Sequence, residues 1–415
     1  MKAPSTSGPY AYSPPYSTAF LPGQPSSSFP ANGQTYIDPI FGRVVRRITE
    51  QALAANSSDI YSRNAWWSAD NTYCVITHDD ATVKAVNVND ATTKPLINNG
   101  GLSRANASCS PVDADDFYFF DAAALKKISI SGGSTTTVKT FGSNLGDLGG
   151  SHDWFDASGR YCVFNFGTDL DNPSFRVWDK QTDTLYSGAI TTPMSWITMS
   201  PGADYLVGNP SGGNFTRYKI MHGTQSLQTT SDFTMISGVG LFGTHADVCT
   251  ASDGRSYLIR PDPDDNPTKL LRFDLETGAK LTILTMPSGN DYWKAGINHV
   301  CCGALGAGRD WCVFESDEPY DHDSTTYFDN FDYPDPVAFW GPITNEICAI
   351  NVLSGTFKRL VHHRTRFQNA VDVYNYEPRP SLSWDGSKIV YASNYGYRST
   401  PDGYCDHYCI ATGIS

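Results

Sequence analysis

Short apolar runs, each followed by a small polar turn, recur along the whole chain. The clearest copies span 64–71, 152–159, 196–203, 246–254 and 379–386, and weaker copies span 106–113 and 299–308. A second run of β-branched or aromatic residues follows each turn. Such residues favour pleated strands, whereas the Ser, Asp and Gly between them favour tight turns. The pattern predicts an all-β chain made of seven copies of one unit.

The spacing of the copies indicates the architecture. Turn residues at 71, 113, 159, 203, 254, 308 and 386 lie 42, 46, 44, 51, 54 and 78 residues apart. A WD40-like blade of four strands takes roughly 40–50 residues. We assign the longest interval to an insertion at about 317–345 and a long connection at about 362–376. Third strands with a hairpin turn follow at 176–182, 271–278 and 347–355.

The two ends of the repeat predict how the ring closes. Residues 42–49 form a lone strand before the first copy, and the final copy supplies only three strands. Pairing the two would remove an exposed sheet edge. We predict a single seven-bladed β-propeller over residues 37–415. A Pro/Ser/Gly-rich extended arm over residues 1–36 precedes it, because that segment has too few apolar residues to fold alone.

Counting back from each turn identifies candidate site residues. Residues two apart share one face of a strand, so positions seven and nine before the turns should form two neighbouring rings at one mouth of the channel. The candidates chosen from these rings are Asn64, Arg104, Asn106, His152, Trp196, His245, Asp247, His299, Glu377 and Arg379. Polar groups converging on a concave mouth indicate a binding site. The alternative is that they satisfy one another, or water, inside the channel.

Composition and charge limit the classes of partner that this protein can bind. Lys and Arg number 30 against 43 Asp and Glu, giving a formal net charge of −13. Nucleic-acid binding requires clustered basic residues, so we expect no nucleic-acid partner. The chain has no apolar run of about 18 residues, so we expect no membrane span. The N-terminal segment also lacks a secretory signal, and we expect synthesis in the cytoplasm.

The ten cysteines are placed more like core residues than like a disulfide framework. Cys74, Cys162 and Cys312 occupy one position of matching strands, which predicts small buried hydrophobic residues. The absence of a C-x-x-C pair argues against a structural zinc site. We favour a reducing compartment and leave open the roles of Cys301, Cys302, Cys405 and Cys409.

Several segments resemble a broad group of bacterial and phage-encoded propeller proteins. The segments are 37–42, 46–49, 243–247, 298–302, 310–316, 346–351, 360–364 and 376–394, and the resemblance covers roughly residues 37–411. It is TolB-like in the Ser-x-Asp-Gly turns and distantly similar to oligogalacturonate lyases. The resemblance implies a propeller fold. One fold hosts many activities, so it implies less about function.

The resemblance to oligogalacturonate lyases also bears on cofactors. Those enzymes bind a divalent metal through histidines, including a His-Pro-His-Pro pattern at the start of the last blade. Here Glu377-Pro378-Arg379-Pro380 stands at that place, and Arg is no metal ligand at ordinary pH. We therefore expect no cofactor, and a divalent metal is the alternative.

Two functions remain open at the level of sequence. The first, which we favour, is a recognition or assembly propeller without enzymatic activity. It would be a tail-associated or other structural protein of a phage virion that contacts glycan or, through its arm, neighbouring subunits. The second is a polysaccharide lyase or other carbohydrate-active enzyme acting on uronate-containing glycan. In that case the resemblance to propeller lyases implies His152, His245, His299 and Arg379 as the catalytic set.

Overall fold

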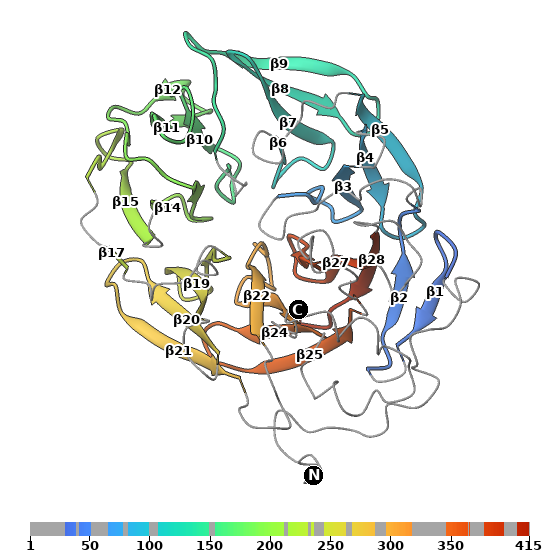
Figure 1. Ribbon diagram of the computed structural model, residues 1–415. Coiled ribbons are helices and arrows are strands. Elements are labelled where there is room, and N and C mark those ends of the chain that lie inside the picture. Colours follow the sequence, from blue (N-terminus) through green and yellow to red (C-terminus); the bar gives the residue numbers. More distant parts are fainter. Residues whose placement is uncertain are drawn as a thin grey trace, which may run out of the picture.

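Seven antiparallel sheets follow one another around a centre and form a β-propeller (Figure 1). The computed structural model describes residues 30–38, 41–50, 65–77, 82–98, 107–148, 154–210, 215–230, 234–235, 245–262, 268–286, 296–317, 346–363, 365, 377–393 and 405–414. The predicted fold is confirmed. Residues 1–29 of the expected arm and 318–345 of the expected insertion lie outside the described residues.

Blades 1–3 contain three or four named strands each. Blade 1 comprises β3 (Tyr73–Thr77), β4 (Thr82–Asn87) and β5 (Thr93–Asn98). Blade 2 comprises β6 (Ala107–Cys109), β7 (Asp116–Asp121), β8 (Ala124–Ser129) and β9 (Thr135–Thr140). Blade 3 comprises β10 (Tyr161–Asn165), β11 (Phe175–Asp179) and β12 (Thr184–Leu185). In blades 1 and 3 the innermost strand is reduced to a bridge, Trp67 opposite Cys74 and Phe155 opposite Cys162.

Blades 4–6 keep their innermost strand. Blade 4 comprises β13 (Trp196–Met199), β14 (Tyr205–Asn209), β15 (Phe215–Met221), β16 (Ser226–Leu227) and β17 (Thr234–Met235). Blade 5 comprises β18 (Asp247–Thr250), β19 (Ser256–Asp262), β20 (Lys269–Asp274) and β21 (Lys280–Thr285). Blade 6 comprises β22 (Gly296–Cys301), β23 (Trp311–Asp317), β24 (Glu346–Asn351) and β25 (Phe357–His362).

Blade 7 closes the ring with strands from both ends of the described chain. Its order is β26 (Ser381–Leu382), β27 (Lys388–Ser393), β28 (Asp406–Ala411), β2 (Val44–Arg47) and β1 (Thr35–Ile37), read from the inside outward. The predicted closing strand is confirmed as β2, and Figure 1 shows it beside β28. The last residues assigned to the arm, Thr35 and Tyr36, pair with β2 as part of β1.

The recurring polar turn has one chemical cause. At the end of the innermost segment a Ser hydroxyl or Asp carboxylate accepts the backbone N–H five residues later. The pairs are Ser68 with Tyr73, Asp156 with Tyr161, Ser200 with Tyr205 and Ser383 with Lys388. These short polar side chains replace a backbone partner and so define the hairpin.

The hydrophobic core lies between adjacent blades. Val207 of blade 4 packs with Val248 and Leu258 of blade 5, and Ile259 of blade 5 packs with Phe314 of blade 6. Hydrogen bonds also join the turns of neighbouring blades. Bonds of this kind join Ala157 to Pro201, Gly202 to Thr250, Ser252 to Asp310, Leu305 to Trp384, and Trp384 to Trp67. Each blade is thus held by its neighbours rather than by its own sheet alone.

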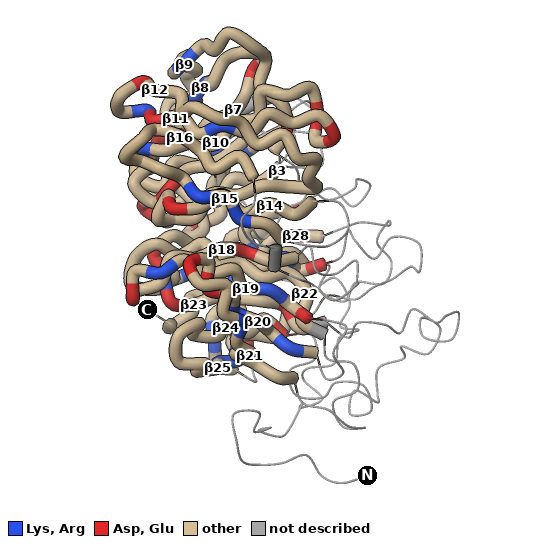
Figure 2. Tube along the Cα trace, turned by 90° about the vertical axis from the view of Figure 1, so that its left-hand side faces the viewer, with Lys and Arg blue, Asp and Glu red and all other residues tan. Residues whose placement is uncertain are grey.

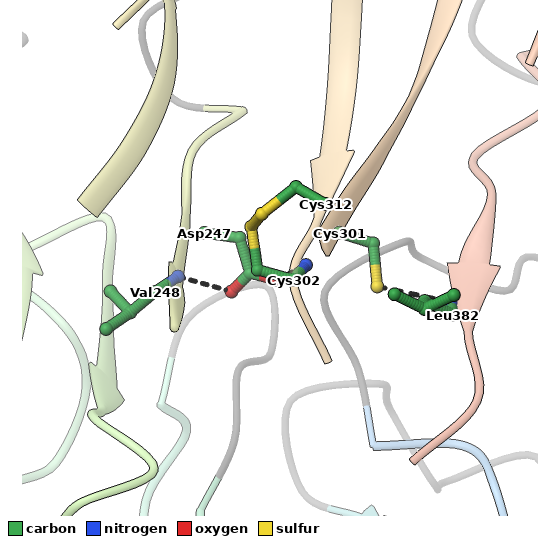
Figure 3. The surroundings of a disulfide bond; sticks show 6 residues. All are labelled: Asp247, Val248, Cys301, Cys302, Cys312 and Leu382. Atoms are coloured by element: carbon green, nitrogen blue, oxygen red, sulfur yellow. Dashed lines mark hydrogen bonds between the residues drawn. A yellow bond between two sulfur atoms is a disulfide. The ribbon is translucent and has the colours of Figure 1, made fainter. Parts of the chain in front are cut away.

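The structure bears out two of the three cysteine predictions. Cys74 and Cys162 are buried free thiols whose pKa is raised by burial. Cys312 is instead joined to Cys302 by a disulfide (Figure 3), so the prediction that it is a reduced core residue was wrong. The two residues lie directly opposite each other, because Cys301 and Val313 are register partners in β22 and β23. The repeated sequence around Cys312 could not reveal this, since the partner lies on another strand.

No described segment is a helix long and apolar enough to cross a membrane. Figure 2 shows basic and acidic residues interspersed along the described trace. Several form pairs that join the turn after the innermost segment of a blade to the end of its third strand, including Arg160 with Asp179 and Arg255 with Asp274. Asp179 also accepts the N–H groups of Gln181 and Thr182, as expected for an Asp that starts a turn.

The seam of blade 7 predicts a large effect of Asp406. Its carboxylate accepts hydrogen bonds from Arg47 Nη2 at 2.6 Å and Thr49 Oγ1 at 3.0 Å. The Arg47 and Asp406 side chains are 9% and 2% exposed. Asp406→Ala should lower the free energy of unfolding by about 3–5 kcal/mol, because it leaves a buried guanidinium without its counter-charge. Urea denaturation measures this loss. The control Asp121→Ala removes an exposed partner of Lys126 and should cost less than about 1 kcal/mol; similar losses would contradict the prediction.

The Arg160–Asp179 pair predicts part of the acid sensitivity. Hydrogen bonds from Arg160 lower the pKa of Asp179 from 3.8 to about 2. A carboxyl whose pKa is lower in the folded chain stabilises it fully above about pH 4, and this contribution disappears as the pH falls through 2. We expect Asp179→Asn to cost about 1 kcal/mol at pH 6, because water screens the partly exposed Arg160. The loss should shrink as the pH falls below 4 and vanish below pH 2. Denaturation of both proteins across this range tests the prediction, and a loss independent of pH would contradict it.

Candidate functional site

A bulge in the innermost strand of blade 6 gathers the polar side chains of the candidate site. Ile297 pairs with Ser316 and Val300 pairs with Phe314, so Asn298 and His299 together oppose the single residue Glu315. Two residues facing one define a β-bulge, which redirects side chains and is common beside functional sites.

Glu315 connects the bulge to blade 7. One carboxylate oxygen lies 2.6 Å from His299 Nδ1, and the other accepts the backbone N–H of Arg379. His299 and Glu315 are both fully buried. Arg379 has a positive φ of 44°, which is unusual for a residue with a side chain. The two hydrogen bonds that Glu315 accepts therefore fix the orientation of the His299 imidazole and the unfavourable backbone conformation of Arg379.

Glu377 is the second carboxylate of the cluster. Its Oε2 accepts hydrogen bonds from Arg379 Nε at 3.2 Å and Nη2 at 3.1 Å. The same oxygen lies 3.7 Å from His299 Nε2. Both ring nitrogens of His299 thus face carboxylates, while the Arg379 guanidinium balances Glu377. A buried charge is tolerated only with such a partner.

His245 and Asn298 extend the cluster to blade 5. Asn298 donates from Nδ2 to Glu377 Oε1 at 3.2 Å and pairs through Oδ1 with His245 Nδ1. An amide oxygen can only accept, so the proton of this second bond belongs to Nδ1. The His245 ring stacks on His299 with centroids 4.1 Å apart. His245, Asn298 and Glu377 are half-buried, whereas His299, Glu315 and Arg379 are buried.

Four of the predicted site residues come together here, namely His245, His299, Glu377 and Arg379. Asp247 lies beside them but has another role, since its carboxylate accepts the N–H groups of Val248 and Cys302. Trp196 is buried between blades 4 and 5, where it packs on Phe215. The remaining candidates lie outside the described residues; they are Asn64, Arg104, Asn106 and His152.

Counting back from the turns missed Asn298 and Glu315. The count assumes strict alternation along a strand, and the bulge breaks that alternation. A signal was present nevertheless. Glu315 is a charged residue directly after the apolar run 312–314, and Asn298-His299 interrupts the run between Ile297 and Val300. Charged residues are rarely buried without a partner, so such interruptions indicate a polar cluster.

The described residues of the cluster are not arranged as a metal site. Among the described residues, no three His, Cys, Asp or Glu side chains are placed to hold an ion together. At the start of blade 7 the Arg379 guanidinium binds the Glu377 carboxylate, and a cation would have to displace it. The expectation that the chain needs no cofactor stays a prediction.

Comparison with known proteins places the fold. No protein-family model matches the chain, and no curated protein matches it in sequence. An oligogalacturonate lyase in complex with manganese has a TM-score of 0.57 at 14% identity, over 92% of this chain and 96% of that one. An oligogalacturonate lyase from Vibrio parahaemolyticus has a TM-score of 0.58 at 11% identity, over 91% and 96%. TolB from Acinetobacter baumannii has a TM-score of 0.35 at 12% identity, over 86% and 64%. At these identities the likeness to the two lyases shows the seven-bladed fold alone.

The cluster predicts a specific cost for removing Glu315. Glu315→Ala leaves the buried His299 ring and the Arg379 backbone N–H without this acceptor. It should therefore lower the free energy of unfolding by about 3–5 kcal/mol, whereas Glu315→Gln, which keeps one acceptor oxygen, should cost less. Chemical denaturation measures both. The control Glu276→Ala removes an exposed carboxylate at another turn and should cost less than about 1 kcal/mol. Equal stability of Glu315→Ala and wild type would refute the assigned role.

Proposed function

We propose that this protein is a recognition propeller that binds glycan through the half-buried residues His245, Asn298 and Glu377. The observation that carries the proposal is the division of the cluster into two parts. His299, Glu315 and Arg379 are buried and bound to one another, while His245, Asn298 and Glu377 are only half-buried and belong to three different segments. The buried part acts as a scaffold, and the half-buried part supplies the contacts.

The chemistry of the half-buried part suits sugar hydroxyl groups. Imidazole, carboxamide and carboxylate side chains together offer N–H donors and oxygen acceptors within a small area. A hydroxyl group both donates and accepts hydrogen bonds, so an uncharged sugar can bond to both the donors and the acceptors of these side chains. Binding sites commonly orient a ligand with a few polar groups fixed in this way.

The buried part argues against acid–base catalysis by the residues expected for a lyase. A general base must reach the proton that it removes, but His299 is fully buried with its two nitrogens facing Glu315 and Glu377. Neutralising a uronate requires an available cation, but the Arg379 side chain is 2% exposed and binds Glu377. These contacts favour binding over cleavage.

A polysaccharide lyase remains the second candidate. It is favoured by the convergence of His245, His299 and Arg379 at one place, as the catalytic hypothesis required. The two similar structures whose names denote oligogalacturonate lyases match this chain along nearly its whole length. In this case His245 would be the base, because it is the half-buried histidine of the set. The assembly role through the arm and the phage origin stay predictions.

Binding and turnover can be measured together. We expect the protein to bind an immobilised panel of neutral and acidic oligosaccharides with selectivity for particular members. His245→Ala and Asn298→Ala should each weaken binding at least tenfold, since each removes a hydrogen-bonding group. Glu377→Gln should do the same, since it replaces one acceptor oxygen with an N–H donor. His222→Ala is the matched control, because His222 is a half-buried histidine that bonds to Tyr186 and Ala203 elsewhere.

The same samples decide between the two candidates. Incubation with oligogalacturonate should give no rise in the absorbance of unsaturated product. A rise that His245→Ala abolishes would replace the recognition proposal with the lyase. Failure of the wild type to bind any member of the panel would overturn the proposal of glycan recognition.

A further inference from the structure

The Cys302–Cys312 disulfide lies next to the bulge that forms the site. Asn298 and His299 are the bulged residues, and Cys302 follows three residues after His299. On the other side of the bulge, Ile297 keeps a regular partner in Ser316. The irregular segment therefore lies between regular strand pairs, and two pairs beyond it, after Val300–Phe314 and Cys301–Val313, the two segments are covalently cross-linked. A bulge interrupts the ladder that normally fixes strand register, so a nearby cross-link can replace that function.

The dipeptide Cys301-Cys302 contacts all three blades that build the site. Cys302 donates its backbone N–H to Asp247 of blade 5 at 2.6 Å and is bonded to Cys312 within blade 6. The Cys301 sulfur accepts the backbone N–H of Leu382 of blade 7 at 3.3 Å. Figure 3 shows the two cysteine side chains pointing in different directions, one toward Cys312 and the other toward Leu382. Asp247 follows His245 by two residues, and Leu382 follows Arg379 by three.

Comparison among the blades shows that the cross-link is a departure from the repeat. In blades 1 and 3 the residues opposite Cys74 and Cys162 are Trp67 and Phe155. Blade 6 has Cys302 in the corresponding place opposite Cys312. A large aromatic side chain in the core is thus replaced by a covalent bond in the blade that carries the bulge.

We infer that the Cys302–Cys312 disulfide is a positioning element of the site, which holds the bulge in the register that turns Asn298 and His299 toward Glu315 and Glu377. If β22 slipped by one residue, Asn298 and His299 would exchange faces and the bonds to His245 and Glu315 would be lost. Ligand binding at the site consequently depends on the oxidised pair. That dependence rests on the proposed function, but the positioning of the bulge does not.

Amide hydrogen exchange measures the positioning without a ligand. Mass spectrometry of the full-length wild type first verifies the Cys302–Cys312 bond. In the double variant Cys302→Ala/Cys312→Ala, exchange of the amides of residues 298–302 and of Arg379 should rise at least tenfold. The matched control Cys74→Ala/Cys162→Ala removes two buried thiols from equivalent strands and should leave these amides protected. Unchanged exchange in the first variant, equal increases in both variants, or free thiols at Cys302 and Cys312 in the oxidised wild type would overturn the inference.

Reduction of the wild type provides a second route if the double variant does not fold. A dithiol such as dithiothreitol transfers two electrons and two protons, so the sulfur–sulfur bond breaks, two thiols form and the dithiol closes to its own disulfide. The same amides should lose protection, and reoxidation should restore it. Reduction without any change of exchange would again contradict the inference.

Glycan binding separates this inference from the proposed function. A loss of protection with no binding by the oxidised wild type would overturn glycan recognition and leave the positioning role intact. Binding that persists unchanged in the reduced protein would overturn the dependence on the disulfide and leave glycan recognition intact.

Discussion

The pairing of β2 with β28 is the interaction on which the rest of the structure depends, because it turns seven separate sheets into a closed ring. Without it, β28 would present an open edge, and blades 1 and 7 would each lack a neighbour. The buried Arg47–Asp406 pair lies at this seam. Closure also brings Trp67 of blade 1 against Trp384 of blade 7, and both residues belong to one hydrophobic cluster.

The candidate site depends on that closure. Its residues come from blades 5, 6 and 7, and no single blade contains a complete set of partners. Buried ions destabilise a fold unless they are paired, and here Arg379, Glu377, His299 and Glu315 satisfy one another across a blade interface. The cluster is therefore part of what aligns blades 6 and 7. The half-buried residues His245, Asn298 and Glu377 are bonded to this cluster or stacked on it, so their positions are fixed as well. Selective binding requires such preorganisation.

The repeated turns and the irregular blade 6 contribute differently to this protein. The Ser and Asp turns recur with the same hydrogen bond in blades 1, 3, 4 and 7, and they reproduce the fold. Blade 6 has three linked irregularities: a bulge at Asn298 and His299 in its innermost strand, a buried Glu315, and a disulfide where blades 1 and 3 place an aromatic ring. The polar cluster coincides with these irregularities.

The sequence by itself determined the all-β fold, the seven units, the closing strand and four members of the cluster. These follow from local patterns, namely turn chemistry and the alternation of side chains along a strand. Only the tertiary structure decided that Asn298 and Glu315 belong to the cluster, that Trp196 lies apart from it, and that Cys312 is cross-linked. The physical reason is that a bulge and a disulfide are relations between strands. Neither the hydrophobic pattern of one strand nor the spacing of its repeats contains the register against the next.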